Sequence, residues 1–117
     1  MKSYRELIVW QKSLKVSRLV YSLTKKLPKE EIYSLVPQMR RAAASIISNI
    51  AEGHERRSTK EYVQFLSIAN GSKAELEAQL LMCVEVGNLT EEDITETMDL
   101  LKEVEKMLGA ITNALEK

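Results

Sequence analysis

Four long stretches of this sequence repeat apolar residues at three-four spacing, and short connections containing proline or glycine separate them. Such spacing places the apolar residues on one face of a helix. No segment alternates as a strand would, and no internal repeat or low-complexity linker is evident. Four amphipathic helices joined by short connections predict an all-α, antiparallel up-down-up-down four-helix bundle. At 117 residues, the chain has the length of a single domain, residues 1–117.

The first two predicted helices are bounded by proline and glycine. The first covers residues 5–26 and ends before Pro28, which cannot continue a helix. Ser34 is the expected N-cap of the second helix, which runs to about Glu52. We expect Gly53 to end this helix by adopting the left-handed conformation that helix C-termini commonly need.

The third and fourth predicted helices begin at capping residues. Residues 58–61 have the S-x-x-E spacing of a capping box, which predicts a long helix over residues 59–86. Gly87 ends that helix. Thr90 together with Asp93 then caps the fourth helix, which has a clear apolar face.

The first helix carries two neighbouring apolar lines, which predict a wide buried face. One line consists of Val9, Val16, Val20, Leu23 and Leu27, and the other of Leu7, Trp10, Leu14 and Tyr21. The cationic residues between these lines should face water: Lys12, Lys15 and Arg18.

Polar side chains interrupt the apolar pattern of the second and third helices at core spacing. In an antiparallel hairpin they lie opposite one another, as Gln38, Arg41, Ser45, Asn49 and Glu52 against Ser72, Glu75 and Gln79. Buried polar groups are costly without partners, so we predict a structural polar network. Arg41 and Glu75 are natural partners, and breaking such a buried pair would cost roughly 3–5 kcal/mol. We interpret the network as fixing helix register and subunit packing rather than as an active site.

Nothing in the sequence predicts catalysis, a cofactor or a metal. His54 is the only histidine and falls in a polar turn, and Cys83 on a core stripe is typical of inert packing. No nucleophile with a nearby base is discernible, and the Glu-x-x-His pairs that di-iron bundles need do not occur. No apolar run approaches the length of about eighteen residues expected of a membrane span, and the N-terminus is charged where a signal peptide would be apolar. We therefore expect a non-catalytic cytoplasmic protein.

Charge is distributed unevenly along a chain whose formal net charge is zero. Residues 1–60 hold 13 Lys and Arg against 5 Asp and Glu, whereas residues 61–117 hold 4 against 12. Such asymmetry favours either a basic face for an acidic partner or two faces that attract between copies of the chain. Under the second hypothesis, the first two helices of one protomer pair with the last two helices of its neighbour. The alternative is two differently charged solvated faces.

An up-down bundle places the turn between the second and third helices beside both chain ends. The basic residues gathered there, which we predict as a nucleic-acid-binding patch, are Lys2, Arg5, Arg56, Arg57 and Lys60. Glu55 and Glu116 dilute the positive charge, and no aromatic residue is interleaved for base stacking. A solvated turn without nucleic-acid contact is the alternative.

Three strings of residues carry a resemblance to a known family: LIVWQKSL, RRAAASIISNIAEG and RRSTKEYVQFLSIANGSKAELEAQL. Their most specific positions are Asn49 to Gly53, Arg57-Ser58, Glu61, Phe65-Leu66 and Gly71-Ser72. Together they resemble the bacterial four helix bundle protein family, also called 23S rRNA intervening-sequence proteins. That name comes from reading frames inside an inserted segment of large-subunit ribosomal RNA genes, and the label S23 ribosomal protein has spread from it.

The resemblance implies an up-down bundle that assembles into a five-fold ring. A similar protein is the accessory variability determinant of diversity-generating retroelements, a basic barrel that binds nucleic acid and a reverse transcriptase. This chain departs from that pattern because it is neutral and its second half is acidic. We predict a homo-oligomeric accessory or scaffold protein associated with RNA or DNA, for which a reverse transcriptase is one candidate protein partner. The alternative is a structural or protein-binding adaptor without nucleic-acid contact.

Overall fold

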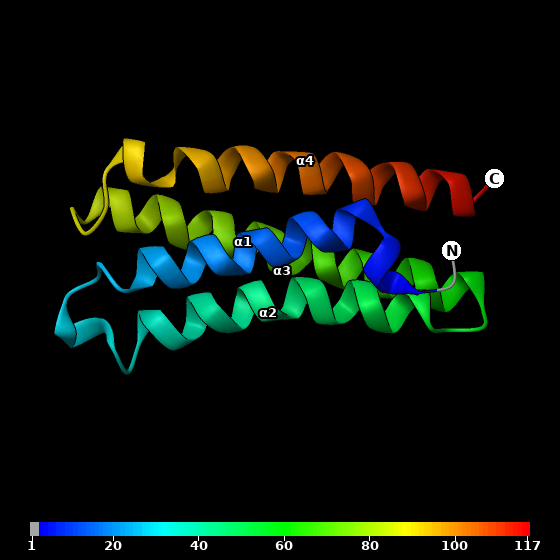
Figure 1. The fold of residues 1–117 in the computed structure, drawn as a ribbon, viewed down its shortest axis with the longest axis horizontal. Coiled ribbons are helices and arrows are strands. Elements are labelled where there is room, and N and C mark those ends of the chain that lie inside the picture. The colour runs from blue at the N-terminus through cyan, green and yellow to red at the C-terminus, as the bar shows by residue number, and fades with distance from the viewer. Residues whose placement is uncertain (1–2) are drawn as a thin grey trace.

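The computed structural model describes residues 3–117, and all regular structure within that range is helical. The elements are the 3-10 helix η1 (Tyr4–Glu6), α1 (Ile8–Thr24), the 3-10 helix η2 (Lys29–Glu31), α2 (Leu35–His54), α3 (Thr59–Glu85) and α4 (Glu91–Leu115). Figure 1 shows α1 to α4 lying side by side along the long axis of the molecule, with the chain reversing direction at each connection. The predicted antiparallel up-down-up-down bundle is confirmed.

Each long helix packs against its neighbours in the chain, and α1 closes the bundle by packing on α4. The start of the described chain at η1, the C-terminus and the turn between α2 and α3 lie at the same end of the bundle (Figure 1). The opposite end carries η2 and the turn between α3 and α4. The sequence-predicted gathering of the chain ends and the α2–α3 turn is therefore confirmed.

The core runs the length of the bundle between the four helices. Its completely buried side chains include Val16, Val20, Met39, Ile46, Ile50, Leu76, Leu80, Leu101 and Val104. The first predicted apolar line of α1 is buried throughout, from Val9 to Leu27. The prediction for the second line is wrong at Leu14 and Tyr21, which remain 45% and 47% exposed. Because α1 packs mainly against α2 and α4 among the long helices, it buries the first apolar line fully and leaves part of the second line at the edge of the buried face.

The beginning of the first predicted helix is divided. Leu7 has extended backbone angles (φ −72°, ψ 125°) and separates η1 from α1. Ser3 and Glu6 form a capping box on η1. Ser34 precedes α2 as expected, but its side chain makes no capping bond and its hydroxyl instead donates to Glu31 Oε1 at 2.7 Å.

Gly53 does not end α2 through a left-handed conformation, so that prediction is wrong. Gly53 is buried inside the helix, and a Cβ there would lie 2.7 Å from Phe65 Cβ and 3.1 Å from Tyr62 Cδ1. The close approach of α3 explains the glycine. Within residues 3–117, the one positive φ is that of Gly87, at 83°.

Gly87 ends α3 as predicted, in a Schellman motif. The backbone N–H of Asn88 donates to the carbonyl of Cys83 at 2.8 Å, and the N–H of Gly87 donates to that of Val84 at 3.1 Å. These two bonds satisfy carbonyls that a helix end otherwise leaves without partners. The left-handed φ of Gly87 costs little because glycine has no Cβ.

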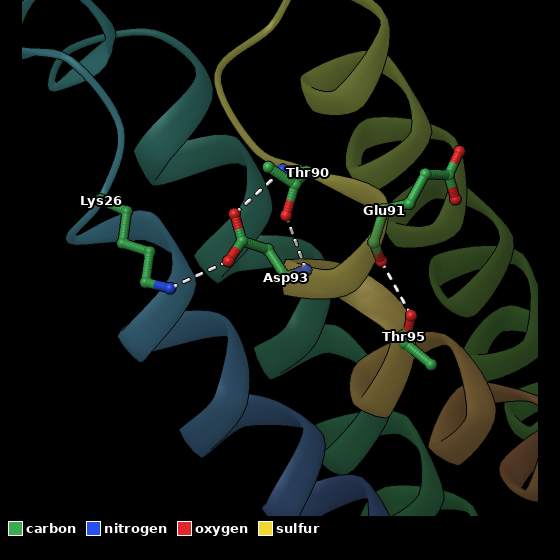
Figure 2. A network of polar contacts seen from close by, with 5 residues as sticks. All are labelled: Lys26, Thr90, Glu91, Asp93 and Thr95. Atoms are coloured by element: carbon green, nitrogen blue, oxygen red, sulfur yellow. Dashed lines mark hydrogen bonds and ion pairs between the residues drawn. The ribbon is translucent and has the colours of Figure 1, made fainter.

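The starts of α3 and α4 are capped, but to different degrees. Ser58 Oγ accepts from the Glu61 N–H at 3.0 Å, so this half of the predicted capping box forms. Thr90 and Asp93 form both halves: the Asp93 N–H donates to Thr90 Oγ1 at 3.0 Å, and the Thr90 N–H donates to Asp93 Oδ2 at 2.9 Å. Figure 2 shows that Lys26, just beyond the end of α1, also donates from its Nζ to Asp93 Oδ1 at 3.0 Å. One carboxylate therefore both caps α4 and ties it to α1.

Candidate functional site

The structure brings together the middle of the predicted polar network. Ser45 Oγ on α2 lies 2.7 Å from Ser72 Oγ on α3, within hydrogen-bonding distance. Asn49 Nδ2 donates to the Ser45 carbonyl at 2.7 Å and to Ser45 Oγ at 3.0 Å. These three residues form a continuous polar link across the α2–α3 seam.

Arg41 and Glu75 do not form the buried ion pair that we predicted. Both are exposed, and neither has an ion pair with any residue of the described chain. They line an open groove of about 520 Å³ between α2 and α3, with Gln38, Ala42, Ser45 and Ser72. Water solvates charges at the outer edge of a helix seam, so the pair gains little from closing.

The remaining network residues have other roles. Gln79 is buried, and its Nε2 donates to Glu75 Oε2 at 3.4 Å. Its Oε1 is buried without a hydrogen-bond partner among the described residues. Glu52 accepts a hydrogen bond at 2.9 Å from Arg56, which lies just beyond the end of α2, and so belongs to the α2–α3 turn rather than to the network.

Lys73 on α3 is a buried, ion-paired residue that was not predicted from the sequence. It is only 4% exposed, yet its Nζ donates to Glu77 Oε1 at 2.9 Å and to Glu105 Oε1 on α4 at 2.6 Å. Burial alone lowers the pKa of Lys73, but the hydrogen bonds to Glu105 and Glu77 outweigh it and raise the pKa overall. Lys73 falls between Ala69 and Leu76 in the apolar stripe of α3, and this spacing could have identified it as a core residue.

His54 and Cys83 differ in their surroundings. His54 is the last residue of α2, where its side chain is only 15% exposed and stands edge-on to the Tyr62 ring. The prediction that His54 falls in a polar turn is therefore wrong, because the histidine is the last residue of α2 and packs against Tyr62 of α3. Cys83 is buried beside Met39, and burial raises the pKa of its thiol. Burial and a raised pKa both reduce the reactivity of a thiol.

Two further features of the described chain bear on function. Residues 3–117 contain no group of three or more His, Cys, Asp or Glu side chains placed to hold a metal ion. None of the helices in that range is both long and apolar enough to cross a membrane.

The predicted basic patch at the α2–α3 turn is mixed in charge. Arg5 lies over the Tyr4 ring at 5.5 Å, and Arg56 lies over the Phe65 ring at 4.8 Å while paired with Glu52. Arg57 and Lys60 are exposed. Acidic residues share this end of the bundle: Glu6, Glu52, Glu55, Glu61 and Glu116. Lys2 lies outside the described residues.

The interface between α1 and α4 uses much of the charge asymmetry within one chain. Lys12 pairs with Glu103 at 2.8 Å, Lys15 with Glu96 at 3.7 Å and Lys26 with Asp93 at 3.0 Å. Of these lysines, Lys12 and Lys15 were predicted to face water or a neighbouring protomer. Because α1 packs directly on α4, carboxylates of α4 in the same chain pair with these lysines.

The α1–α2 face keeps its positive charge. Arg40 Nε donates to the buried Thr24 Oγ1 at 2.9 Å, and the Arg40 guanidinium lies 4.2 Å from the centre of the Tyr21 ring. Tyr21 also lines an open groove of about 500 Å³ on α1, with Gln11, Leu14, Lys15, Ser17 and Arg18. No Asp or Glu occurs in residues 7–29 or 32–51. We call the residues Arg18, Tyr21, Lys25 and Arg40 the α1–α2 basic row.

The outward face of α3 carries several large hydrophobic side chains that are exposed. Its large exposed hydrophobic residues are Ile68, Leu81, Met82 and Val86. Small exposed residues lie between them: Gly71, Ala74 and Ala78. We call these seven residues the α3 outer face. A helix that is apolar on both sides usually contacts something on both sides.

Comparison with known proteins identifies the relatives of this bundle. The model of the family described as "23S rRNA-intervening sequence protein" matches residues 5–110. A crystal structure of a protein of unknown function from the S23 ribosomal protein family of Bacteroides thetaiotaomicron has a similar fold, with a TM-score of 0.82 and 25% sequence identity. The match covers 90% of this chain and 98% of that one. No curated protein matches the chain. Because the family model spans most of the sequence, this chain belongs to the 23S rRNA-intervening sequence protein family.

Proposed function

We propose that this protein is a non-catalytic, self-associating bundle that acts as an accessory or scaffold protein for nucleic acid. The carrying observation is the separation of charge on its surface. Residues 7–29 and 32–51 carry Arg18, Lys25, Arg40 and Arg41 and no acidic residue, whereas most acidic residues lie on α3 and α4. A basic surface provides the electrostatic attraction that binds phosphates.

Self-association is proposed through the α3 outer face, with a second copy of the chain as its occupant. Gly71, Ala74 and Ala78 would allow close approach of another helix, and Leu81 and Met82 would supply the apolar area. A five-fold ring is the assembly that the resemblance implies, and we retain it as part of the proposal.

Light scattering coupled to size-exclusion chromatography tests self-association. A charge in the α3 outer face, Ala78→Glu, should convert the assembly to monomers because a carboxylate would be buried unpaired in the interface. Ala110→Glu on α4 is the matched control, since it places the same exposed glutamate on a helix outside that face. A monomeric wild-type protein, or equal effects of both substitutions, would contradict self-association through α3.

Fluorescence anisotropy with short RNA and DNA, titrated with salt, tests nucleic-acid association. Micromolar or tighter binding that weakens steeply with salt would support the proposal, because phosphate contacts release condensed counterions. Absence of binding at low salt would remove the nucleic-acid role.

The second candidate function is a protein-binding adaptor without nucleic-acid contact. The α3 outer face favours it, because the apolar side chains there suit a protein partner as well as another copy. A reverse transcriptase is one candidate partner. Binding through apolar contacts would persist as salt rises, which separates this function from phosphate binding.

A further inference from the structure

We infer that the α1–α2 basic row is a binding site for single-stranded nucleic acid, in which the cations contact phosphates and Tyr21 stacks on a base. The inference rests on the proposed nucleic-acid association and assigns it to a specific surface. That surface lies on the side of the bundle, not at the α2–α3 turn predicted from sequence.

The charges of the row are free for a ligand. The lysines on the α4 side of α1, Lys12, Lys15 and Lys26, are already paired with carboxylates. Arg18 and Lys25 have no ion pair among the described residues, and Arg40 uses only its Nε in a hydrogen bond. The two terminal nitrogens of Arg40 therefore remain as donors, and such donors suit the paired oxygens of a phosphate.

Arg40 and Tyr21 of the row are held in place before any ligand arrives. Thr24 is 3% exposed and fixes the Arg40 Nε at 2.9 Å, while the Tyr21 ring supports the guanidinium plane from 4.2 Å. Arg18, Tyr21 and Lys25 are spaced three and four residues apart, so they follow one another along one side of α1. Holding a long side chain in place before binding reduces the entropy lost on binding.

The groove beside the row favours a single strand over a duplex. Leu14 and Tyr21 form an apolar wall, and Lys15 and Arg18 line the same groove. Unpaired bases stack on aromatic side chains and present their phosphates to nearby cations, whereas the bases of a duplex are stacked on one another. At the α2–α3 turn, by contrast, Arg56 is already paired with Glu52, and further acidic residues share that end of the bundle with the cations.

Anisotropy of labelled oligonucleotides of about 20 nucleotides, long enough to cover such a site, provides the test. The full-length protein is compared with two double variants, Arg18→Gln/Lys25→Gln in the row and Arg56→Gln/Arg57→Gln at the α2–α3 turn, which remove the same charge. We expect the row variant to weaken single-strand binding by about tenfold or more and to lower the salt slope by roughly 0.7 for each phosphate that the variant no longer neutralises. The turn variant should bind nearly as wild type does.

Substitutions at Tyr21 test the stacking interaction separately. Tyr21→Leu should weaken single-strand binding by about 5- to 100-fold, whereas Tyr21→Phe, which keeps the ring, should bind as wild type does. Neither Arg18 nor Lys25 makes a side-chain hydrogen bond in the described chain, and helical circular dichroism verifies that each variant folds.

Different failures are distinguishable. If wild type binds nucleic acid but the turn variant alone loses binding, the inference is wrong and the proposed function stands. Tighter binding of duplex than of single strand, or an undiminished Tyr21→Leu affinity, would also overturn it. If the row variant becomes monomeric, the row is an interface between copies and not a nucleic-acid site. If wild type binds neither RNA nor DNA, the proposed nucleic-acid function fails as well.

Discussion

Gly53 of α2 packs directly against Phe65 of α3: a Cβ on the glycine would lie 2.7 Å from the Cβ of the phenylalanine. The obstructing atom is attached to the backbone and cannot rotate away. Gly53→Ala should therefore destabilise the bundle by up to about 2 kcal/mol, because overpacking costs roughly 1–3 kcal/mol and the gain in helix propensity offsets about 1 kcal/mol of it. Urea denaturation followed by circular dichroism measures the difference.

Gly109→Ala is the control for that substitution. Gly109 lies in α4, is exposed and has no atom within 4 Å of an added Cβ. Here the same change should stabilise the protein by about 0.5–1 kcal/mol. Equal effects at both glycines would mean that the contact with Phe65 does not limit the approach of α2 and α3.

Lys73→Met should destabilise the protein although it replaces a charge with a side chain of similar volume. The substitution leaves Glu77 and Glu105 near one another without their shared donor. Hydrogen bonds between charged groups contribute about 1.5–3 kcal/mol each, and the partial exposure of both carboxylates places the expected loss near the lower value. A double-mutant cycle with Glu105→Gln isolates the contact between α3 and α4, and additive effects in that cycle would contradict it.

Stability should fall as the pH falls below about 5. Hydrogen bonds from the Thr90 backbone and from Lys26 lower the folded-state pKa of Asp93. A hydrogen bond from Lys12 lowers the pKa of Glu103, and one from Lys73 lowers the pKa of Glu105. The unfolded chain therefore binds protons first. The stabilisation is complete above the ordinary carboxyl pKa of about 4 and is lost as the pH falls through the lower folded values.

Urea midpoints measured between neutral and acidic pH test this dependence. Asp93→Asn should flatten the acidic part of the profile, because it removes a titrating group that is bonded in the folded state. Asp99→Asn, on the same helix but without an ion pair among the described residues, should leave the profile nearly unchanged. Profiles that change equally in both variants would assign the acid sensitivity elsewhere.

Cys83 should react with thiol reagents only when the bundle opens. The side chain is completely buried, and burial raises the pKa of its thiol, so the reactive thiolate is scarce and inaccessible. Labelling of the native protein should be slower than that of the denatured chain by roughly a thousandfold or more. Ser48→Cys in a Cys83→Ala background places a thiol at an exposed site and should label rapidly. Fast labelling of native Cys83 would show that the core opens locally there.

Apolar spacing and capping residues were sufficient to predict the bundle. The buried line of α1, the Thr90–Asp93 cap and the left-handed Gly87 all appear where their local chemistry places them. Each of these features depends on residues within a few positions along the chain. Sequence patterns report such short-range relationships well.

Relationships between helices were harder to predict. Arg41 and Glu75 are on the correct seam, but the rotation of α2 and α3 leaves both at its edge. Gly53 resembles a helix terminator, and only the approach of Phe65 reveals why it is glycine. The pairing of α1 lysines with α4 carboxylates likewise depends on which helices become neighbours. Composition alone left open an acidic partner, contacts between copies of the chain or two solvated faces.

The order of the helices around the bundle has a consequence for how the chain folds. Three of the helix interfaces in the described chain join consecutive helices, and only the interface between α1 and α4 brings together opposite ends of the sequence. Contacts between nearby residues lose little entropy on closure, so a chain of this topology should fold rapidly. Closure of α4 onto α1 has the highest entropic cost and is expected to come last. The ion pairs at Lys12, Lys15 and Lys26 would then mainly slow unfolding and contribute little to the rate of folding.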